Sequence, residues 1–279
     1  VDQGGNCHFC IVVAMGTLKF LAGRVALVTG STSGIGESVA RGLAQRGANI
    51  VLNGFGDDQH IKNLLASFKK EYNIDAAYVG GDLSDPKDVN ALHDVALKKF
   101  PGGIDILVNN AGFQHVSPLE TFPLDIWNKM VAVMLTAPFQ LTKLTVGNMR
   151  AKGWGRIVNI ASAHGLVASP NKVAYVTIKH GVMGFTKTVS LETAGTGITC
   201  NAVCPGYVET PLFLKQAEDR AKDQGITIED GKRQILSTHP SGEPVKVSEV
   251  ADIVSFLCST AANQMTGTSM VVDGGWTAR

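Results

Sequence analysis

Residues 25–36 read VALVTGSTSGIG, an apolar run followed at once by a turn that carries three glycines. The apolar run predicts a buried strand, and the amphipathic stretch 37–46 predicts a helix directly after the turn. A second apolar run, 49–52, follows that helix. This order predicts a βαβ unit whose glycine turn lets the backbone approach a bound anion.

Apolar runs alternate with amphipathic helical stretches through the rest of the chain. Further strands are expected at 76–79, 104–108, 155–160, 198–203 and 269–272, and further helices near 58–72, 86–99, 123–150, 173–194 and 246–259. This alternation is typical of a parallel sheet that is covered by helices on both faces. We therefore expect an α/β fold over residues 18–279, a single-domain Rossmann-type doubly wound parallel sheet of about seven strands.

The segment 210–241 differs from its surroundings because it is polar and follows the pair Pro205 and Gly206. Such a segment predicts one or two surface helices on an excursion from the sheet. An excursion at this place in the chain can cover a site. We therefore expect a helical substrate lid near 210–241.

Composition and charge exclude several classes of partner. The formal net charge of the 279 residues is +1, and the basic residues form no run that could follow a phosphate backbone, so nucleic acid is not expected. The apolar stretch 9–15 is too short to cross a membrane, and no membrane role is expected. The five cysteines are few and unevenly placed, which favours a reducing compartment such as the cytoplasm.

Residues 1–17 are expected to be a tail outside the domain. Cys7 and Cys10 flank His8 and resemble half of a metal site, but no second cluster with matching spacing follows, so no metal is expected. Met15 followed by Gly16 is typical of a natural start, so residues 1–14 are expected to be either an artificial addition or a weak extension, and the tail to be disordered.

The glycine turn is a candidate for the pyrophosphate of a dinucleotide, held at the N-terminus of the following helix. The second strand is followed by Asn53, Gly54, Phe55, Gly56 and Asp57, without the usual acidic residue for a ribose hydroxyl directly after the strand. Nor does a basic residue stand there to hold a 2′-phosphate. The cofactor is therefore expected to be NAD, with Asn53 or loop backbone at the ribose and Phe55 either beside it or simply packed in the loop.

A tyrosine and a lysine four residues apart predict a proton-transfer site. On the expected helix 173–194, Tyr175 and Lys179 share a face. A phenol has an ordinary pKa of about 10, and a neighbouring cation favours its ionised form. Tyr175 is therefore a candidate acid and base, with the hydroxyl of Ser162 upstream of it as a second polar group.

With these residues in view, the chain resembles the short-chain dehydrogenase/reductase family from Leu18 to Arg279. The resemblance is carried by four ordered motifs, at 29–36, 109–112, 162 with 175 and 179, and 205–210. It implies a nicotinamide-dependent oxidoreductase with Ser162, Tyr175 and Lys179 as the catalytic set. It also implies that Lys179 holds the cofactor ribose, and that the protein is a homotetramer with 86–150 and 173–194 as candidate interfaces.

The resemblance also implies a set of cofactor-binding residues. They are Gly30, Thr32, Ser33, Gly34, Ile35, Gly36, Asn53, Phe55, Asp82, Leu83, Asn109, Ala111, Gly112, Tyr175, Lys179, Pro205, Gly206, Val208 and Thr210. Three of them have ordinary structural alternatives. Asp82 could cap the following helix, Asn109 could satisfy buried backbone, and Thr210 could start a helix.

Within the family, the segments 53–56, 110–115, 161–166 and 272–276 most resemble dehydrogenases that interconvert a short hydroxy acid and its oxo acid. A buried carboxylate needs hydrogen-bond donors or a cation. The resemblance implies as substrate-binding residues Gln114, His164, Lys172, Tyr207, Gln216 and Trp276. Each has an ordinary alternative: Lys172 as an exposed lysine, His164 as a structural histidine, Gln216 as a solvated helix residue, and Tyr207 and Trp276 as core aromatics. Tyr207 also departs from the resemblance, which leads us to expect tryptophan at this position.

One position departs from the family pattern. The family's catalytic asparagine, which helps to position a water between Lys179 and solvent, falls at Met134. A thioether cannot replace an amide that donates and accepts hydrogen bonds. We expect a different or slower proton relay, with the Met134 carbonyl as a possible water ligand. Two further functions stay open, a reductase for another carbonyl (3-oxoacyl or sugar acid) and a weakly catalytic NAD(H)-binding protein.

Overall fold

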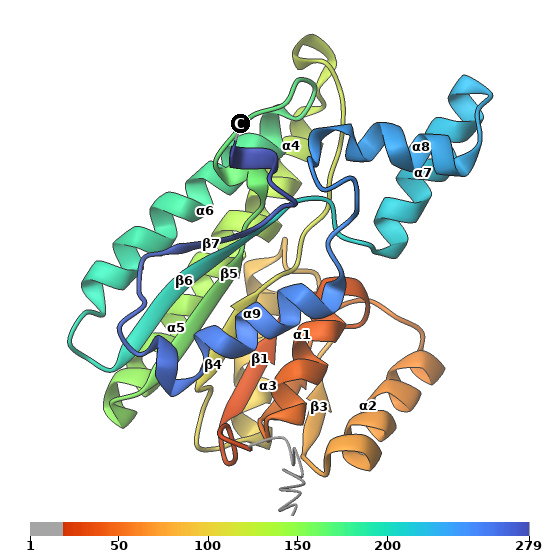
Figure 1. Ribbon diagram of the computed structural model, residues 1–279. Helices are drawn as coiled ribbons and strands as arrows, with labels where there is room; N and C mark the ends of the chain where they lie inside the picture. The colour runs from red at the N-terminus through yellow and green to blue at the C-terminus, as the bar shows by residue number, and fades with distance from the viewer. Residues whose placement is uncertain (1–18, 279) are drawn as a thin grey trace, which may run out of the picture.

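The structure is a computed structural model and describes residues 19–278 (Figure 1). Within this range seven strands form one sheet in the order β3-β2-β1-β4-β5-β6-β7, and every neighbouring pair is parallel. The strands are β1 (Val25–Val28), β2 (Asn49–Leu52), β3 (Ala76–Tyr78), β4 (Ile106–Asn109), β5 (Gly155–Ile160), β6 (Ile198–Pro205) and β7 (Ser269–Val272). The predicted parallel sheet is confirmed. The expected tail, with Cys7, Cys10 and Met15, lies outside the described residues.

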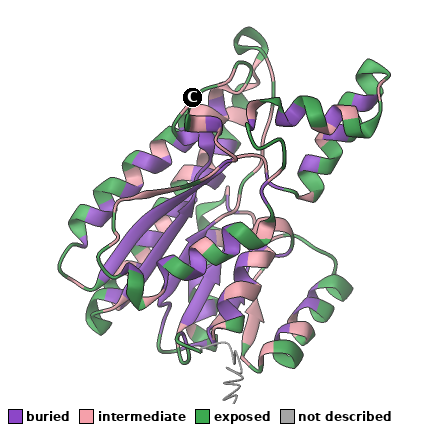
Figure 2. Ribbon diagram, in the orientation of Figure 1, coloured by how far each residue is buried: buried purple, intermediate pink, exposed green. Residues whose placement is uncertain are grey.

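Helices cover both faces of the sheet (Figures 1 and 2). The helices are α1 (Gly34–Gln45), α2 (Asp58–Tyr72), α3 (Pro86–Lys99), α4 (Leu124–Val131), α5 (Ala137–Lys152), α6 (Val173–Glu192), α7 (Pro211–Gln224), α8 (Ile228–Ile235) and α9 (Val247–Leu257). Along β1, Val25 and Leu27 enter the core shared with α3, α5 and α6, whereas Ala26 and Val28 enter the core shared with α1, α2 and α9. Because successive strand residues point to opposite faces, one buried strand serves both cores, and the doubly wound fold is confirmed.

The strand order reverses at β1, whose neighbours are β2 on one side and β4 on the other. The chain leaves β1 toward α1 on one face of the sheet and leaves β4 toward the elements of the opposite face. In open sheets of this kind, diverging loops leave a crevice outside the carboxyl ends of the strands, where ligands bind. The fold therefore places the site at this edge.

The helix expected at 123–150 is interrupted, which corrects the sequence prediction. A π-helical segment, Ala132–Thr136, separates α4 from α5, and the Ala137 N–H donates to the Ala132 carbonyl five residues back. The cause lies at Pro138, which has no N–H to donate to the Met134 carbonyl and whose ring disfavours a regular α-helix at that turn.

The helical stretch Leu124–Lys152 contains an 18-residue window with a mean hydropathy of 1.3, long and apolar enough to cross a membrane. Its residues Met130, Met134, Leu141 and Met149 are nevertheless buried in the protein core. By its packing, this stretch is a core helix of the sheet domain.

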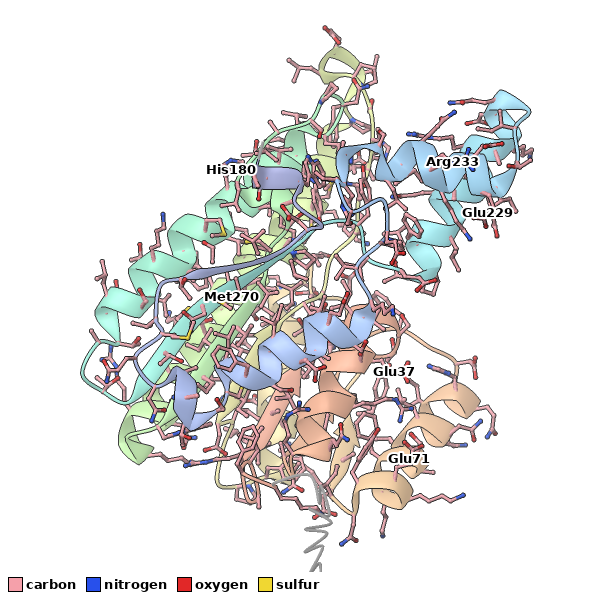
Figure 3. The ribbon with its side chains drawn as sticks, in the orientation of Figure 1. Glu37, Glu71, His180, Glu229, Arg233 and Met270 are labelled. Carbon is pink, nitrogen blue, oxygen red and sulfur yellow. The ribbon has the colours of Figure 1, made fainter. Side chains whose placement is uncertain are left out.

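The excursion at 210–241 forms two helices that project from the body of the protein, α7 and α8 (Figure 1). They have a small core of their own, in which Phe213, Ala217, Ile235 and Leu236 are buried. The side chains of Glu229 and Arg233 are exposed along α8 (Figure 3). The predicted surface helices are present, and their action as a lid stays a prediction.

Candidate active site

A cavity of about 840 Å³ opens at the carboxyl ends of the strands, from the glycine turn after β1 to Trp276. Its volume lies within the range of ligand-binding clefts. All but one of the residues that the sequence nominated line it. They are Gly30, Thr32, Ser33, Gly34, Ile35, Gly36, Asn53, Phe55, Asp82, Leu83, Ala111, Gly112, Gln114, Ser162, His164, Lys172, Tyr175, Lys179, Pro205, Gly206, Tyr207, Val208, Thr210, Gln216 and Trp276.

The glycine turn has the geometry of an anion site. Gly30 has a φ of +60°, and a Cβ at Gly36 would overlap the Gly30 carbonyl oxygen. The helix α1 starts here, and its N-cap residue Ser33 makes no side-chain hydrogen bond to the first-turn amides. Uncapped amides at a helix N-terminus can bind the oxygens of a pyrophosphate. The residues of the turn therefore fit a dinucleotide.

Asn109 is the nominated residue that does not line the cavity. It is buried, and its Nδ2 donates to Asn159 Oδ1 at 2.8 Å, so its contact is structural but is made to a side chain and not to backbone as the alternative expected. Asn110 lines the cavity instead, and its Nδ2 donates to the carbonyls of Thr29 and Gly30 at 2.9 and 3.0 Å. Adjacent residues at a strand end face opposite sides, so one step along the chain decides between the two asparagines.

Asn53, Gly54 and Phe55 of the loop after β2 line the cavity. The side chain of Asn53 is buried and donates to the Val79 carbonyl at 3.0 Å. Phe55 is 75% exposed, and its carbonyl accepts a hydrogen bond from Thr32 Oγ1 at 2.7 Å. Asn53 thus shapes the loop through its side chain, and the ring of Phe55 is free to contact a ligand.

Asp82 is an ionised group at the same end of the cavity. The Ser84 backbone N–H and hydroxyl donate to it at 2.9 and 2.8 Å, and these bonds lower the pKa of its carboxyl. Lys129 Nζ lies 3.3 Å from the other oxygen. The following helix, α3, is capped by Asp85 through the Lys87 N–H. The capping alternative for Asp82 is therefore wrong.

The three expected catalytic residues meet at the centre of the cavity. Ser162 follows β5, and Tyr175 and Lys179 lie one turn apart on α6. Lys179 Nζ lies 5.3 Å from the Tyr175 ring centroid and donates to the Ile160 carbonyl at 2.8 Å. The ammonium of Lys179 thus lies beside the Tyr175 phenol, as the four-residue spacing predicted.

Burial controls the protonation of these two groups. It lowers the pKa of Lys179 to about 8 and raises the pKa of Tyr175, an effect that Ser162 opposes. The expected lowering of the tyrosine pKa is therefore not a property of the protein alone. Further positive charge at the site is needed to favour the phenolate.

Polar side chains from four segments gather at the other end of the cavity. Lys172 Nζ donates to the Tyr207 hydroxyl at 3.4 Å, and Gln216 Nε2 donates to Gln114 Oε1 at 3.3 Å. Burial, followed by the charge of Lys172, lowers the pKa of His164 to about 4, so this histidine is neutral at pH 7. The cluster therefore offers one cation and several neutral polar groups.

Two aromatic rings form one wall of this polar cluster. Tyr207 and Trp276 are stacked, with their ring centroids 5.4 Å apart and an interplanar angle of 4°. Trp276 also meets His164 edge to face at 4.8 Å. These contacts restrict the space beside Lys172. Thr210 lines the cavity and also caps α7 by accepting from the Phe213 N–H at 3.3 Å.

Met134 is 2% exposed and lines the cavity beside Gly112. A Cβ at Gly112 would lie 2.8 Å from Met134 Sδ, so the thioether packs directly on this backbone. Several other lining residues were not nominated from the sequence, among them Lys129, Leu212 and Phe213. Leu212 and Phe213 follow Pro211 in the first turn of α7; the proline marks the start of the helix but carries no signal for which side faces the cavity.

Comparisons with known proteins agree with this geometry. Residues 30–277 match a family described as enoyl-(acyl carrier protein) reductase. The chain is 49% identical over 260 residues to the D-beta-hydroxybutyrate dehydrogenase of Cupriavidus necator, covering 93% of this chain and 100% of that protein. It is 46% identical over 257 residues to the D-beta-hydroxybutyrate dehydrogenase of Rhizobium meliloti, covering 92% and 99%.

Solved structures include L-sorbose reductase from Gluconobacter frateurii in complex with NADPH and L-sorbose. It superposes with a TM-score of 0.89 at 30% identity, covering 94% of this chain and 99% of that one. The sheet, the cavity and these similarities agree. The chain belongs to the short-chain dehydrogenase/reductase family of oxidoreductases.

Proposed function

We propose that this enzyme interconverts D-3-hydroxybutyrate and 3-oxobutyrate, with NAD as the cofactor. The observation that carries the proposal is Lys172, a half-buried cation that lines the cavity together with Tyr175. None of the ion pairs formed among residues 19–278 involves it. A substrate carboxylate would supply the missing negative charge. The relatives named for this reaction support the choice of acid.

The choice of NAD over NADP rests on the charges along the cavity. Among the described lining residues the only Lys or Arg side chains are Lys129, Lys172 and Lys179. Lys129 pairs with Asp82, Lys172 faces the polar cluster, and Lys179 lies beside Tyr175. This leaves the loop 53–57 without a cation for a 2′-phosphate, and its exposed Phe55 suits an uncharged ribose.

The dinucleotide would be held by the turn from Gly30 to Gly36, by Asp82 and by Lys179. The nicotinamide of the dinucleotide, when bound, supplies the hydride acceptor for oxidation of the alcohol. Ser162 would hydrogen-bond the substrate hydroxyl, and Tyr175 would take the hydroxyl proton. Because burial raises the pKa of Tyr175, proton removal needs the charge of Lys179 and of the oxidised cofactor at the site. In reduction, Tyr175 would return the proton.

Met134 changes how protons reach the site from solvent. Its thioether has no hydrogen-bond donor, so a water near Lys179 would depend on the Met134 carbonyl. Pro138 has no N–H, so the usual α-helical donor to that carbonyl is missing. We infer a functional but slower relay than an asparagine side chain would give.

We also infer a homotetramer in a reducing compartment. Exposed Phe139 on α5 and Leu191 on α6 suit an interface between copies of the chain. Cys200, Cys204 and Cys258 are free and buried. Light scattering on the purified protein tests the assembly, and a monomer at micromolar concentration would refute it.

The substrate assignment is tested by comparing the reduction of acetoacetate with that of its neutral methyl ester, using NADH. A carboxylate pocket predicts a kcat/KM for the acid at least about tenfold higher, because a charged hydrogen bond contributes about 1.5 kcal/mol or more. Equal rates, or a preference for the ester or a 3-oxoacyl thioester, would favour a reductase for another carbonyl. Tight NADH binding without turnover would indicate a binding protein.

A further inference from the structure

His239 lies directly behind the aromatic wall of the polar cluster, although no sequence pattern nominated it. It is 3% exposed and follows the short helix Leu236–Thr238 at the end of the excursion. Its ring centroid lies 5.5 Å from that of Tyr207 and 5.8 Å from that of Trp276. The histidine therefore contacts both rings of the wall.

Two hydrogen bonds fix the tautomer of this histidine. The Tyr207 backbone N–H donates to His239 Nε2 at 2.9 Å, which requires a lone pair on that nitrogen. The Glu243 carbonyl lies 3.1 Å from Nδ1 and can only accept, so Nδ1 carries the hydrogen. His239 is thus a neutral ring that links the segment after β6 to the segment that enters α9.

The surrounding backbone is shaped around this ring. A Cβ at Gly206 would overlap Nε2 of His239, and a Cβ at Gly274 would lie 3.2 Å from Nδ1. Gly274 also has a φ of +60°, which favours glycine. The segments that carry Tyr207 and Trp276 can therefore both approach His239 closely.

The same place is the stem of the excursion that carries α7 and α8. The Val245 N–H donates to the Tyr207 carbonyl and the Glu209 N–H donates to the Val245 carbonyl, both at 2.8 Å. Val208 and Val245 form a parallel bridge. Backbone hydrogen bonds thus hold the two ends of the excursion together beside Tyr207. The His239 side chain adds a further hydrogen bond at the same place, from the Tyr207 N–H.

We infer that His239 is a positioning residue for substrate binding. It holds Tyr207 against Trp276 so that the Tyr207 hydroxyl meets Lys172 Nζ at 3.4 Å, and it thereby sets the position of the cation that receives the substrate carboxylate. This inference rests on the proposed function, since it assigns Lys172 to an acid substrate. His239 itself does not touch the reacting atoms.

The test compares His239→Leu with His239→Gln. Leucine leaves the Tyr207 N–H without its acceptor, whereas the glutamine amide can accept that bond and donate to the Glu243 carbonyl. We expect His239→Leu to raise KM for D-3-hydroxybutyrate about tenfold, with kcat and KM for NAD within about twofold of wild type. His239→Gln should restore most of the KM. Equal behaviour of the two variants, or an equal rise in KM for NAD, would overturn the inference.

Two matched measurements separate this role from a loss of stability. His93→Leu removes another buried histidine, on α3 outside the lining of the cavity, and should leave both KM values unchanged. If His239→Leu does not fold, Tyr207→Phe tests the next link, since it removes only the hydroxyl that meets Lys172. We expect a higher KM for the acid, and an unchanged KM would overturn the inference.

A double variant tests whether His239 acts through Lys172. In a Lys172→Met background, His239→Leu should cause no further rise in KM for the acid, and an additive rise would contradict the inference. Failure of the proposed function has a different signature, because wild type itself would then show no turnover of D-3-hydroxybutyrate. If wild type turns over D-3-hydroxybutyrate and His239→Leu has the same KM, the inference about His239 is refuted and the proposed function stands.

Discussion

The replacement Lys172→Met removes the cation of the polar cluster while keeping a side chain of similar length. A hydrogen bond to a charged group contributes about 1.5 to 3 kcal/mol, and the lower value applies here because Lys172 is half-buried and solvent screens its charge. This corresponds to a rise of about 12-fold in KM for D-3-hydroxybutyrate. The hydride-transfer residues Ser162, Tyr175 and Lys179 are untouched, so kcat should change much less than KM.

The assay is the initial rate of NADH formation at saturating NAD, over a range of acid concentrations. Lys187→Met is the matched control, because Lys187 lies exposed on the same helix, α6, and does not line the cavity. It should leave KM unchanged. A Lys172→Met enzyme with the wild-type KM, or with a lowered kcat and an unchanged KM, would refute the assignment of Lys172 to the carboxylate.

Three further predictions concern the cofactor turn and the proton path. Gly36→Ala should weaken NAD binding at least about tenfold, measured by fluorescence titration, because the new Cβ would overlap the Gly30 carbonyl; unchanged binding would count against the anion site. Met134→Asn should raise kcat, and the solvent isotope effect on kcat should be larger in wild type than in this variant. An equal or lower kcat in the variant would argue against an impaired proton relay. Burial lowers the pKa of Lys179 from 10.5 to about 8, so between these pH values the unfolded chain binds more protons than the folded protein. The free energy of unfolding of wild type relative to Lys179→Met, measured with urea, should therefore rise from pH 8 to pH 10.5. A flat or falling difference would contradict the lowered pKa of the buried lysine.

Local patterns were sufficient for the sheet and for the centre of the site. The apolar runs predicted the strands because five of the seven are buried along nearly their whole length, whereas the edge strands β3 and β7 are only partly buried. The four-residue spacing placed Lys179 beside Tyr175 on α6. The helix break near Met134 was also present in the sequence, since Pro138 has no N–H, but the apolar periodicity across 123–150 concealed it.

Other features depended on contacts that no local pattern contains. Asn109 and Asn110 differ by one position, and only the end of β4 decides which of them faces the cavity. His239 reaches Tyr207 from 32 residues away, through the stem of an excursion whose path the sequence does not specify. The pKa of Tyr175 depends on the depth of its burial, which opposes the effect expected from Lys179.

The proposed reaction is hydride transfer between the D enantiomer of 3-hydroxybutyrate and NAD. The most direct measurement is the initial rate of NADH formation from D-3-hydroxybutyrate, with the L enantiomer and NADP as parallel controls and Tyr175→Phe as the chemical control. We expect turnover with the D acid and NAD, little with the L acid or with NADP, and almost none in Tyr175→Phe. No turnover by wild type, or equal rates with both enantiomers, would contradict it.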